Sequence, residues 1–369
     1  MNTPNPPSTL PALARLRADV QSMHAYAVQD SRGFVKLDAM ENPYPLPLEL
    51  QAALGARLGA LAINRYPGAR LEDLKAALAR HAALPEGWAL MLGNGSDELI
   101  SLLALACDLP GASILAPQPG FVMYAMSAQL QGLAFHAVPL GADFALDAPA
   151  MCAAIERHRP AIVYLAYPNN PTATLWEREA MARIIAAQRA QGGLVVIDEA
   201  YQPFAARTWL DEVKADRAAH RHVLVMRTLS KFGLAGVRLG YLMGEAALIH
   251  EFDKVRPPYN VSVLNAECAL FALEHEAVFA AQAAAIRAAR GELMVALGAL
   301  PGVTVFPSEA NMILVRVPDA VRVFAGMKSH GVLVKNVSTM HPMLANCLRL
   351  TVGTPDENRA QLSALQASL

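Results

Sequence analysis

The sequence predicts an α/β fold, with a large domain whose mostly parallel central sheet is covered by helices, plus a smaller α/β C-terminal domain. From about residue 48 to 250, helical patterns alternate with short apolar runs, which is typical of a parallel sheet with helices on both faces. An alanine-rich stretch at about 262–299 predicts one long helix. Short strand patterns return beyond Pro301, and 369 residues are enough for two domains with cores of their own.

The composition indicates a soluble enzyme of a reducing compartment, which we expect to be cytoplasmic. Lysine and arginine number 31 against 32 acidic residues, so no basic excess favours nucleic acid. No apolar run is long enough for a membrane span, and the first residues lack the pattern of a signal peptide. The four cysteines are widely spaced, as free thiols are. The ten histidines show no metal-binding spacing beyond the pair His220 and His222, so we expect no metal.

The order of patterns along the chain predicts three parts. Residues 1–35 form an N-terminal arm, with a helix at about 12–25, that packs with the small domain. Residues 36–255 form the large domain and residues 256–369 the small one. The boundary between these two falls where Lys254–Asn260 interrupts the helical pattern with two prolines.

A helix start near residue 95 predicts an anion site. Gly95, Ser96 and Asp97 open an apolar helix. Small residues at a helix start leave backbone N–H groups free, and the helix dipole favours an anion there. The glycine spacing does not match the dinucleotide pattern G-x-G-x-x-G. Taken alone, such a start is more often an ordinary helix cap.

Two apolar runs further along predict buried strands that end in polar residues. The run Ala161–Ala166 leads into Asn170, which precedes a proline in a turn. The run Leu194–Ile197 stops in Asp198, and Tyr201 follows shortly after. Taken alone, Asn170 is more often a turn former and Asp198 more often a helix cap.

A third run, Val223–Thr228, predicts a buried strand followed by hydroxyl and cationic side chains. Ser230 and Lys231 come directly after it, and Arg238 follows a glycine-containing segment. Ligands of parallel sheets bind at this rim. A lysine there can form a Schiff base with an aldehyde while its neighbours bind a phosphate, and pyridoxal phosphate needs both. A single lysine is more often a solvated surface residue.

The three strand ends together suit that cofactor better than any one of them does. The pyridine nitrogen must be protonated for the ring to take up electrons, so a carboxylate such as Asp198 has to lie against it. The phenolate oxygen needs hydrogen-bond donors, which Asn170 and Tyr201 can provide.

The motifs Asn169–Thr172, Asp198–Tyr201 and Thr228–Lys231 occur in this order, and the chain resembles the fold type I aminotransferases, which use pyridoxal 5'-phosphate. Within that family it is most similar to the histidinol-phosphate aminotransferases. The resemblance extends from about Tyr26 to about Gly353. Three flanking segments carry the finer likeness: Lys36–Pro43, Asn64–Pro67 and Cys347–Thr354.

The resemblance implies a role for each site residue. Lys231 would be the Schiff-base lysine and the proton shuttle, and Asp198 would pair with the pyridinium nitrogen. Asn170 and Tyr201 would hold the phenolate oxygen, and Phe121 would stack on the ring. The phosphate would be bound by Gly95, Ser96, Asp97, Thr228, Ser230 and Arg238.

The resemblance also implies a homodimer and a substrate site. Tyr66 would reach the phosphate of the neighbouring subunit's cofactor. Arg349 would bind the anionic end of the substrate, with Tyr26 and Asn170 helping, and Lys335 would add positive charge. Considered without the resemblance, Arg349 could form a structural ion pair and Lys335 a solvated strand end.

The sequence departs from the family pattern at several positions. Met40 stands where many members have asparagine, and Phe121 where tyrosine is common. Lys335 replaces a frequent arginine, which keeps the charge but loses the two-pronged geometry that suits phosphate. One residue fewer separates Lys231 from Arg238 than in many members. These departures bear on substrate recognition more than on cofactor chemistry.

The activity implied by the resemblance is a ping-pong transfer of an amino group between L-histidinol phosphate and 2-oxoglutarate, with L-glutamate as the other amino acid, in histidine biosynthesis. The partners would be small molecules, with neither nucleic acid nor a membrane. Two alternatives of the same fold stay open, an aromatic amino-acid aminotransferase and an amino-acid-phosphate decarboxylase. A pyridoxal-phosphate-binding regulator without turnover would need a DNA-binding segment, for which the short N-terminal arm leaves no room.

Overall fold

The computed structural model describes residues 10–23 and 29–369, which fall into two compact units, residues 1–32 and 33–369. The described part of the first unit contains a 3-10 helix, η1 (Pro11–Arg15), and a short α-helix, α1 (Ala18–Ser22). The single helix expected over residues 12–25 is therefore wrong. Leu16 and Arg17 have ψ angles of 144° and 135°, which are extended and interrupt the helix.

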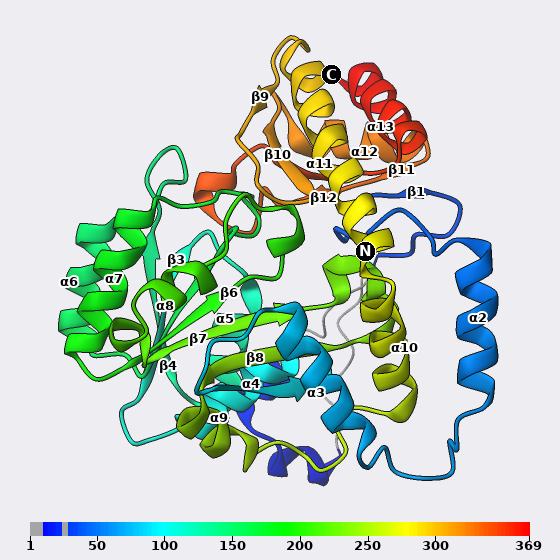
Figure 1. Cartoon of the computed structure of the whole chain (residues 1–369). Coiled ribbons are helices and arrows are strands. Elements are labelled where there is room, and N and C mark those ends of the chain that lie inside the picture. Colours follow the sequence, from blue (N-terminus) through cyan, green and yellow to red (C-terminus); the bar gives the residue numbers. More distant parts are fainter. Residues whose placement is uncertain (1–9, 24–28) are drawn as a thin grey trace. The chain divides into compact units, whose positions relative to one another are not determined.

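The large sheet in the described part of the chain has seven strands in the order β2-β8-β7-β6-β5-β3-β4 (Figure 1). Neighbouring strands are parallel except at β8, which is antiparallel to both β2 and β7. The expectation of a mostly parallel sheet is confirmed. The strands are β2 (Trp88–Gly93), β3 (Ser113–Gln118), β4 (Ala134–Pro139), β5 (Ile162–Ala166), β6 (Leu194–Asp198), β7 (Val223–Thr228) and β8 (Gly240–Glu245).

Both faces of this sheet are buried, which explains why its central strands are continuous apolar runs. In β7, Val223 and Val225 belong to one hydrophobic cluster, and the alternate residues Leu224 and Met226 belong to another. Helices cover each face. They are α3 (Arg70–His81), α4 (Ser96–Ala106), α5 (Val122–Gln131), α6 (Ala148–His158), α7 (Arg178–Ala190), α8 (Leu210–Ala215) and α9 (Ala246–Asp253), with short turns η2 (Gln202–Phe204), η3 (Ala218–His220), η4 (Ser230–Leu234) and η5 (Ala235–Val237). Helix α2 (Leu48–Gly59) packs instead on a later helix, Val263–Glu274.

The C-terminal part builds a second, antiparallel sheet in the order β12-β13-β10-β9, with a hydrophobic cluster of its own. In Figure 1 it appears in orange, with α11, α12 and α13 beside it. The elements are β9 (Thr304–Val305), β10 (Met312–Arg316), α12 (Ala320–Ser329), β12 (Lys335–Asn336), η6 (Pro342–Leu344), β13 (Cys347–Thr351) and α13 (Pro355–Ser368). A short parallel pair joins β1 (Val35–Lys36) to β11 (Val332–Leu333). The expected domain boundaries at residues 35 and 255 stay predictions.

The long helix expected at 262–299 is wrong, because the structure has two helices there. They are α10 (Val263–Glu274) and α11 (Glu276–Gly298), bent by 76°. His275 between them has φ −113° and ψ 30°, outside the α-helical region. The bend lets the two helices serve different cores, since α10 packs on α3 while most buried residues of α11 join the cluster of the second sheet.

Among the described residues, no single helix is long and apolar enough to cross a membrane, and only the bent pair α10 and α11, taken together, reaches that length and composition.

Candidate active site

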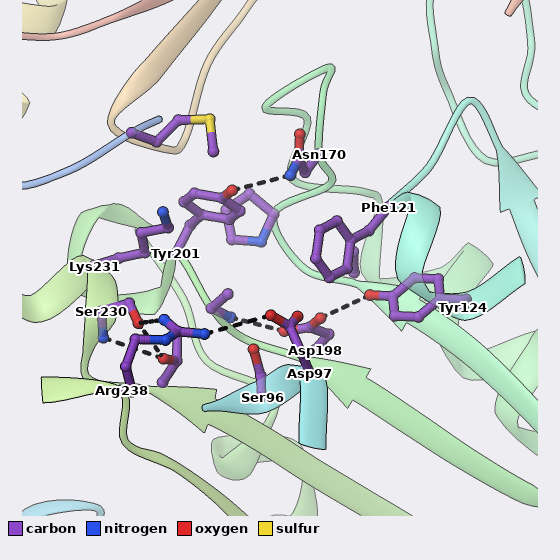
Figure 2. Close-up of a pocket in the computed structure, with 15 residues that line it drawn as sticks. Ser96, Asp97, Phe121, Tyr124, Asn170, Asp198, Tyr201, Ser230, Lys231 and Arg238 are labelled. Carbon is purple, nitrogen blue, oxygen red and sulfur yellow. Dashed lines mark hydrogen bonds and ion pairs between the residues drawn. The ribbon is translucent and has the colours of Figure 1, made fainter. Parts of the chain in front are cut away.

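A pocket lies where β5, β6 and β7 end, at the rim where the sequence predicts a ligand. Figure 2 shows side chains from these strand ends and from the starts of α4 and α5 converging on it. Parallel strands end at one edge of a sheet, so residues far apart in the chain meet there. The residues predicted for the site that line the pocket are Ser96, Asp97, Phe121, Asn170, Asp198, Tyr201, Thr228, Ser230, Lys231 and Arg238.

Lys231 lies in the tight turn after β7, and its amine points into the pocket (Figure 2). Its Nζ donates a hydrogen bond to the carbonyl oxygen of Ala39 at 2.8 Å and lies 6.0 Å from the ring centre of Tyr201. Burial, with the nearby Arg349 guanidinium adding repulsion, lowers the pKa of Lys231 to about 8. The amine therefore has a substantial neutral fraction near neutral pH, as a nucleophile or base requires.

Asp198 ends β6 and is 4% exposed. Its carboxylate accepts hydrogen bonds from the Tyr124 hydroxyl at 2.7 Å and from the Ala200 N–H at 3.1 Å. Burial raises the pKa of Asp198 to about 6, although the bond from Tyr124 opposes this. Within residues 10–23 and 29–369, no ion pair joins it to a cationic side chain. A buried carboxylate of this kind suits a protonated ring nitrogen brought by a ligand.

Asn170, Tyr201 and Arg349 form one hydrogen-bonded chain. Asn170 Nδ2 donates to the Tyr201 hydroxyl at 3.1 Å, and Arg349 Nη1 donates to Asn170 Oδ1 at 2.8 Å. All three side chains are buried, and burial raises the pKa of Tyr201, so its phenol stays neutral and can donate. Arg349 comes from β13 of the second sheet and does not itself line the pocket, so this chain links the second sheet to the pocket residues Asn170 and Tyr201.

The anion site predicted at the start of α4 faces Arg238. Arg238 Nη1 donates to the Ser230 hydroxyl at 3.2 Å, and its Nη2 lies 3.4 Å from an Asp97 carboxylate oxygen. Gly95 has φ +83°, and a Cβ there would lie 2.7 Å from Arg238 Nη2, so a side chain would collide with the guanidinium. The Thr228 hydroxyl lies 3.0 Å from that of Ser230. Two hydroxyls, a guanidinium and helix N–H groups thus gather on one side of the pocket.

Phe121 precedes the first turn of α5, and its ring meets that of Tyr124 edge-on, with centres 5.6 Å apart. Tyr124 is a site residue that sequence reasoning missed. It lines the pocket, bonds Asp198 and stacks on Tyr164 with ring centres 4.3 Å apart. The available signal was its position three residues after Phe121, in the first turn of the helix that begins there. The Ala39 carbonyl was missed too, and backbone groups leave no trace in sequence.

The remaining predicted residues lie elsewhere. Lys335 pairs with Arg349 across β12 and β13, so both side chains are on one face of that sheet, but Lys335 does not line the pocket. Tyr66 is 76% exposed and stacks on Tyr259, with ring centres 4.2 Å apart. Tyr26 falls outside the described residues. Met40, noted as a departure from the family pattern, lines the pocket.

The described part of the chain contains no cluster of three or more histidine, cysteine, aspartate and glutamate residues placed to hold a metal ion.

Known proteins resemble this chain over nearly its whole length. A Paracidovorax citrulli protein named histidinol-phosphate aminotransferase is 70% identical over 97% of this chain and 98% of its own length. One of the same name from Methylibium petroleiphilum is 69% identical, covering 98% of this chain and 97% of its own. The crystal structure of histidinol-phosphate aminotransferase from Sinorhizobium meliloti, in complex with pyridoxal-5'-phosphate, superposes with a TM-score of 0.84 at 25% identity, over 97% of this chain and 98% of that one.

Residues 33–365 match the family described as aminotransferase class I and II. This match takes in the large sheet, the second sheet and every described residue of the pocket. The resemblance seen in the sequence is confirmed, and the chain belongs to the class I and II aminotransferase family.

Proposed function

We propose that this chain transfers an amino group between L-histidinol phosphate and 2-oxoglutarate, with L-glutamate as the other amino acid. The observation that carries the reaction type is Lys231, with its depressed pKa, in the same pocket as the buried carboxylate Asp198. The substrate is supported by the shared name of the two curated relatives, histidinol-phosphate aminotransferase.

Pyridoxal 5'-phosphate fits the donor set of this pocket. When bound, it supplies an aldehyde that condenses with amines and a protonated ring that takes up electrons. Asp198 would pair with the ring nitrogen, and Asn170 and Tyr201 would donate to the phenolate oxygen. Phe121 would lie against the ring. The phosphate would be held by the backbone of Gly95, Ser96 and Asp97 and by Thr228, Ser230 and Arg238.

Lys231 carries the proton in the proposed mechanism. Its neutral amine would accept the α-proton of the substrate and donate it to the aldehyde carbon of the cofactor. It can do so because the side chain reaches into the pocket and has a pKa near working pH. Asp198 keeps the ring nitrogen protonated throughout. Tyr201 stays neutral and donates to the ring oxygen. The half-reactions run in turn on the same groups, which makes the kinetics ping-pong.

Substrate recognition would centre on the second sheet. Arg349 would bind the anionic end of each substrate, and Lys335, opposite it on β12, would add charge at the same face. A phosphate ester and a dicarboxylate could then use one positive region in turn. Tyr26 would assist from the N-terminal arm.

We also propose a homodimer in which Tyr66 reaches the phosphate site of the neighbouring subunit. The support is that its ring is exposed and away from the pocket of its own chain. A cytoplasmic location is supported by the free cysteines Cys107, Cys152, Cys268 and Cys347.

The rate at which the cofactor-free protein captures pyridoxal phosphate covalently is expected to rise with pH and to reach half its maximal value near pH 8. Only the neutral amine is nucleophilic, and burial moves the pKa of Lys231 down from 10.5 to about 8. At pH 7 about a tenth of the amine is then neutral, against about one part in three thousand for an ordinary lysine. The measurement is the rate of the absorbance change from pH 6 to 10. A midpoint above 10 would show that Lys231 is not desolvated.

Tyr66→Phe is expected to weaken cofactor retention several-fold while the fold stays intact, because one hydrogen bond to the phosphate is lost. The measurement is pyridoxal phosphate released during dialysis. Tyr259→Phe is the matched control, since it removes a hydroxyl from the same exposed ring pair. A fully active monomer, or equal loss in both variants, would contradict the shared site.

A single half-reaction tests the proposed function. The cofactor-loaded protein is mixed with L-histidinol phosphate without any oxo acid, and the absorbance is followed. Rapid conversion of the cofactor to its amine form, reversed by 2-oxoglutarate, is the expected result. Conversion by aromatic amino acids only would identify an aromatic aminotransferase. Release of carbon dioxide from an amino-acid phosphate, without need of an oxo acid, would identify a decarboxylase.

A further inference from the structure

A short segment beside the pocket presents successive carbonyl groups to a buried arginine and a half-buried lysine. The carbonyl of Asp38 accepts from Arg349 Nη2 at 2.9 Å. The next carbonyl, of Ala39, accepts from Lys231 Nζ at 2.8 Å. Both principal cations of the proposed site are therefore oriented by backbone of one segment, and the conformation of that segment decides where they point.

The next residue, Met40, has an unusual backbone conformation. Its φ is +54°, a left-handed value that few residues other than glycine adopt and that is unfavourable for a side chain of this size. A backbone in this region persists only when its surroundings hold it. Its conformation fixes the direction of the carbonyl groups just before it.

Two buried side chains from the second sheet hold Met40. Its N–H donates to the hydroxyl of Thr351 at 3.1 Å, and its carbonyl accepts from Asn311 Nδ2 at 2.9 Å. Thr351 ends β13, two residues after Arg349, and Asn311 immediately precedes β10. The backbone N–H of Thr351 also donates to the Leu37 carbonyl at 3.2 Å, so the segment is hydrogen-bonded to this sheet on either side of the turn.

The burial of Asn311 destabilises the folded state, which a purely structural role does not explain. The residue is fully buried, and its Oδ1 has no hydrogen-bond partner among the described residues. A buried acceptor without a donor destabilises the folded state and offsets what the Nδ2 bond contributes. What the side chain does achieve is to fix the direction of the Met40 carbonyl.

We propose that Thr351 and Asn311 are positioning residues, which hold the Met40 turn so that the carbonyl groups before it orient the lysine and the arginine of the site. This inference rests on the proposed function, because it takes Lys231 to be the cofactor-binding amine. When that amine is free, the Ala39 carbonyl keeps it in the pocket, where it can receive the substrate proton.

Loss of the Met40 turn should lower the pKa of Lys231. A carbonyl acceptor stabilises the ammonium more than the amine, so losing it lowers the pKa further. The other charged groups that act on the amine are Arg349, Glu41, Arg238 and Asp97. A substitution at Thr351 removes none of these charges. Release of Arg349, which lowers the pKa of Lys231, would raise that pKa, so a lower midpoint reports the loss of the carbonyl contact.

The test is the pH dependence of pyridoxal phosphate capture by cofactor-free protein. Thr351→Val keeps the shape of the side chain but removes the hydroxyl, and its capture midpoint is expected to lie about half a pH unit or more below that of the wild type. Thr351→Ser retains the hydroxyl and should restore the wild-type midpoint. In the loaded enzyme, Thr351→Val should also raise the KM for L-histidinol phosphate about three- to tenfold, because Arg349 loses its orientation.

Ile155→Val is the matched control, since it trims a fully buried side chain of α6 that does not line the pocket. It should lower Tm without moving the midpoint, as a merely structural defect would. If Thr351→Val does not fold, Asn311→Leu makes the same test from the other side of the turn. An unchanged midpoint in either folded variant overturns the inference. Failure of the wild type to capture the cofactor would overturn the proposed function and this inference together.

Discussion

Replacing Lys231 by alanine is expected to abolish turnover, with a loss of about ten-thousand-fold or more. The substitution removes the amine that lies in the pocket 2.8 Å from the Ala39 carbonyl, and no other lysine among the described residues lines that pocket. Both the covalent attachment of the cofactor and the proton transfer depend on this one nitrogen in the proposed mechanism. The measurements are kcat for the full reaction and the protein mass after reduction with borohydride in the presence of pyridoxal phosphate.

The control for this variant is Lys254→Ala. Lys254 is exposed and pairs with Glu251 on α9, so the change removes an amine without touching the pocket. It should keep both turnover and the covalent adduct. The Lys231→Ala protein should still bind pyridoxal phosphate non-covalently, because the phosphate side of the pocket is unchanged. Wild-type activity or a retained adduct at Lys231→Ala would refute the central assignment.

Replacing Asp198 by asparagine is expected to lower kcat by a factor of about 10²–10³ while sparing the fold. An amide has nearly the same shape: its single oxygen can accept the hydrogen bond from the Ala200 N–H, while its NH2 group donates to the Tyr124 hydroxyl, which then accepts. It carries no charge, however, and cannot keep the ring nitrogen protonated. The measurement is kcat with saturating substrates, together with the amount of cofactor bound per chain.

Asp143→Asn is the matched control. Asp143 accepts a hydrogen bond from the N–H two residues ahead at 3.1 Å, the same contact that Asp198 makes, but it lies in an exposed turn. It should leave kcat within about two-fold of wild type, as surface changes generally do. Equal activity of the Asp198→Asn and wild-type enzymes would exclude the pairing with the ring nitrogen.

Asp198→Asn lowers the activity of the loaded enzyme, but it is expected to stabilise the cofactor-free protein above about pH 6. Burial raises the pKa of Asp198 from 3.8 in the unfolded chain to about 6 in the folded one. The folded state then binds the proton more tightly, so the contribution of this group to stability is fully present below pH 3.8 and is lost as the pH rises through about 6. Above that pH, Asp198→Asn should be more stable than the wild type by up to about 3 kcal/mol. Urea unfolding at pH 5 and 8 would measure the difference, and a pH-independent difference would contradict it.

Much of the proposed site could be predicted from sequence because of one geometrical rule. Asn170, Asp198 and Lys231 each follow an apolar run, and the runs proved to be β5, β6 and β7 of one parallel sheet. Their ends meet at one rim by necessity. The start of α4 at Ser96 was predictable as well, because glycine before a short polar stretch marks a helix start locally.

Other features could not be predicted because they depend on contacts between distant segments. The bend at His275 lies in a stretch whose local pattern is helical throughout, and it arises because α10 and α11 pack on different cores. Lys335 stands in a strand of its own, opposite Arg349, where the sequence suggested only the end of the preceding strand. Sheet register of this kind depends on tertiary packing.

By itself, then, the sequence determined the α/β class, the family and which residues we propose to carry the chemistry, since local apolar periodicity and strand-end residue types are properties of the chain alone. The tertiary structure alone decided how those groups are oriented. The Tyr124 hydroxyl on Asp198, the Ala39 carbonyl on Lys231 and the Thr351 hydroxyl on the Met40 turn join residues 74, 192 and 311 positions apart. Such contacts form only when packing brings distant segments together, and no local preference of either partner encodes them.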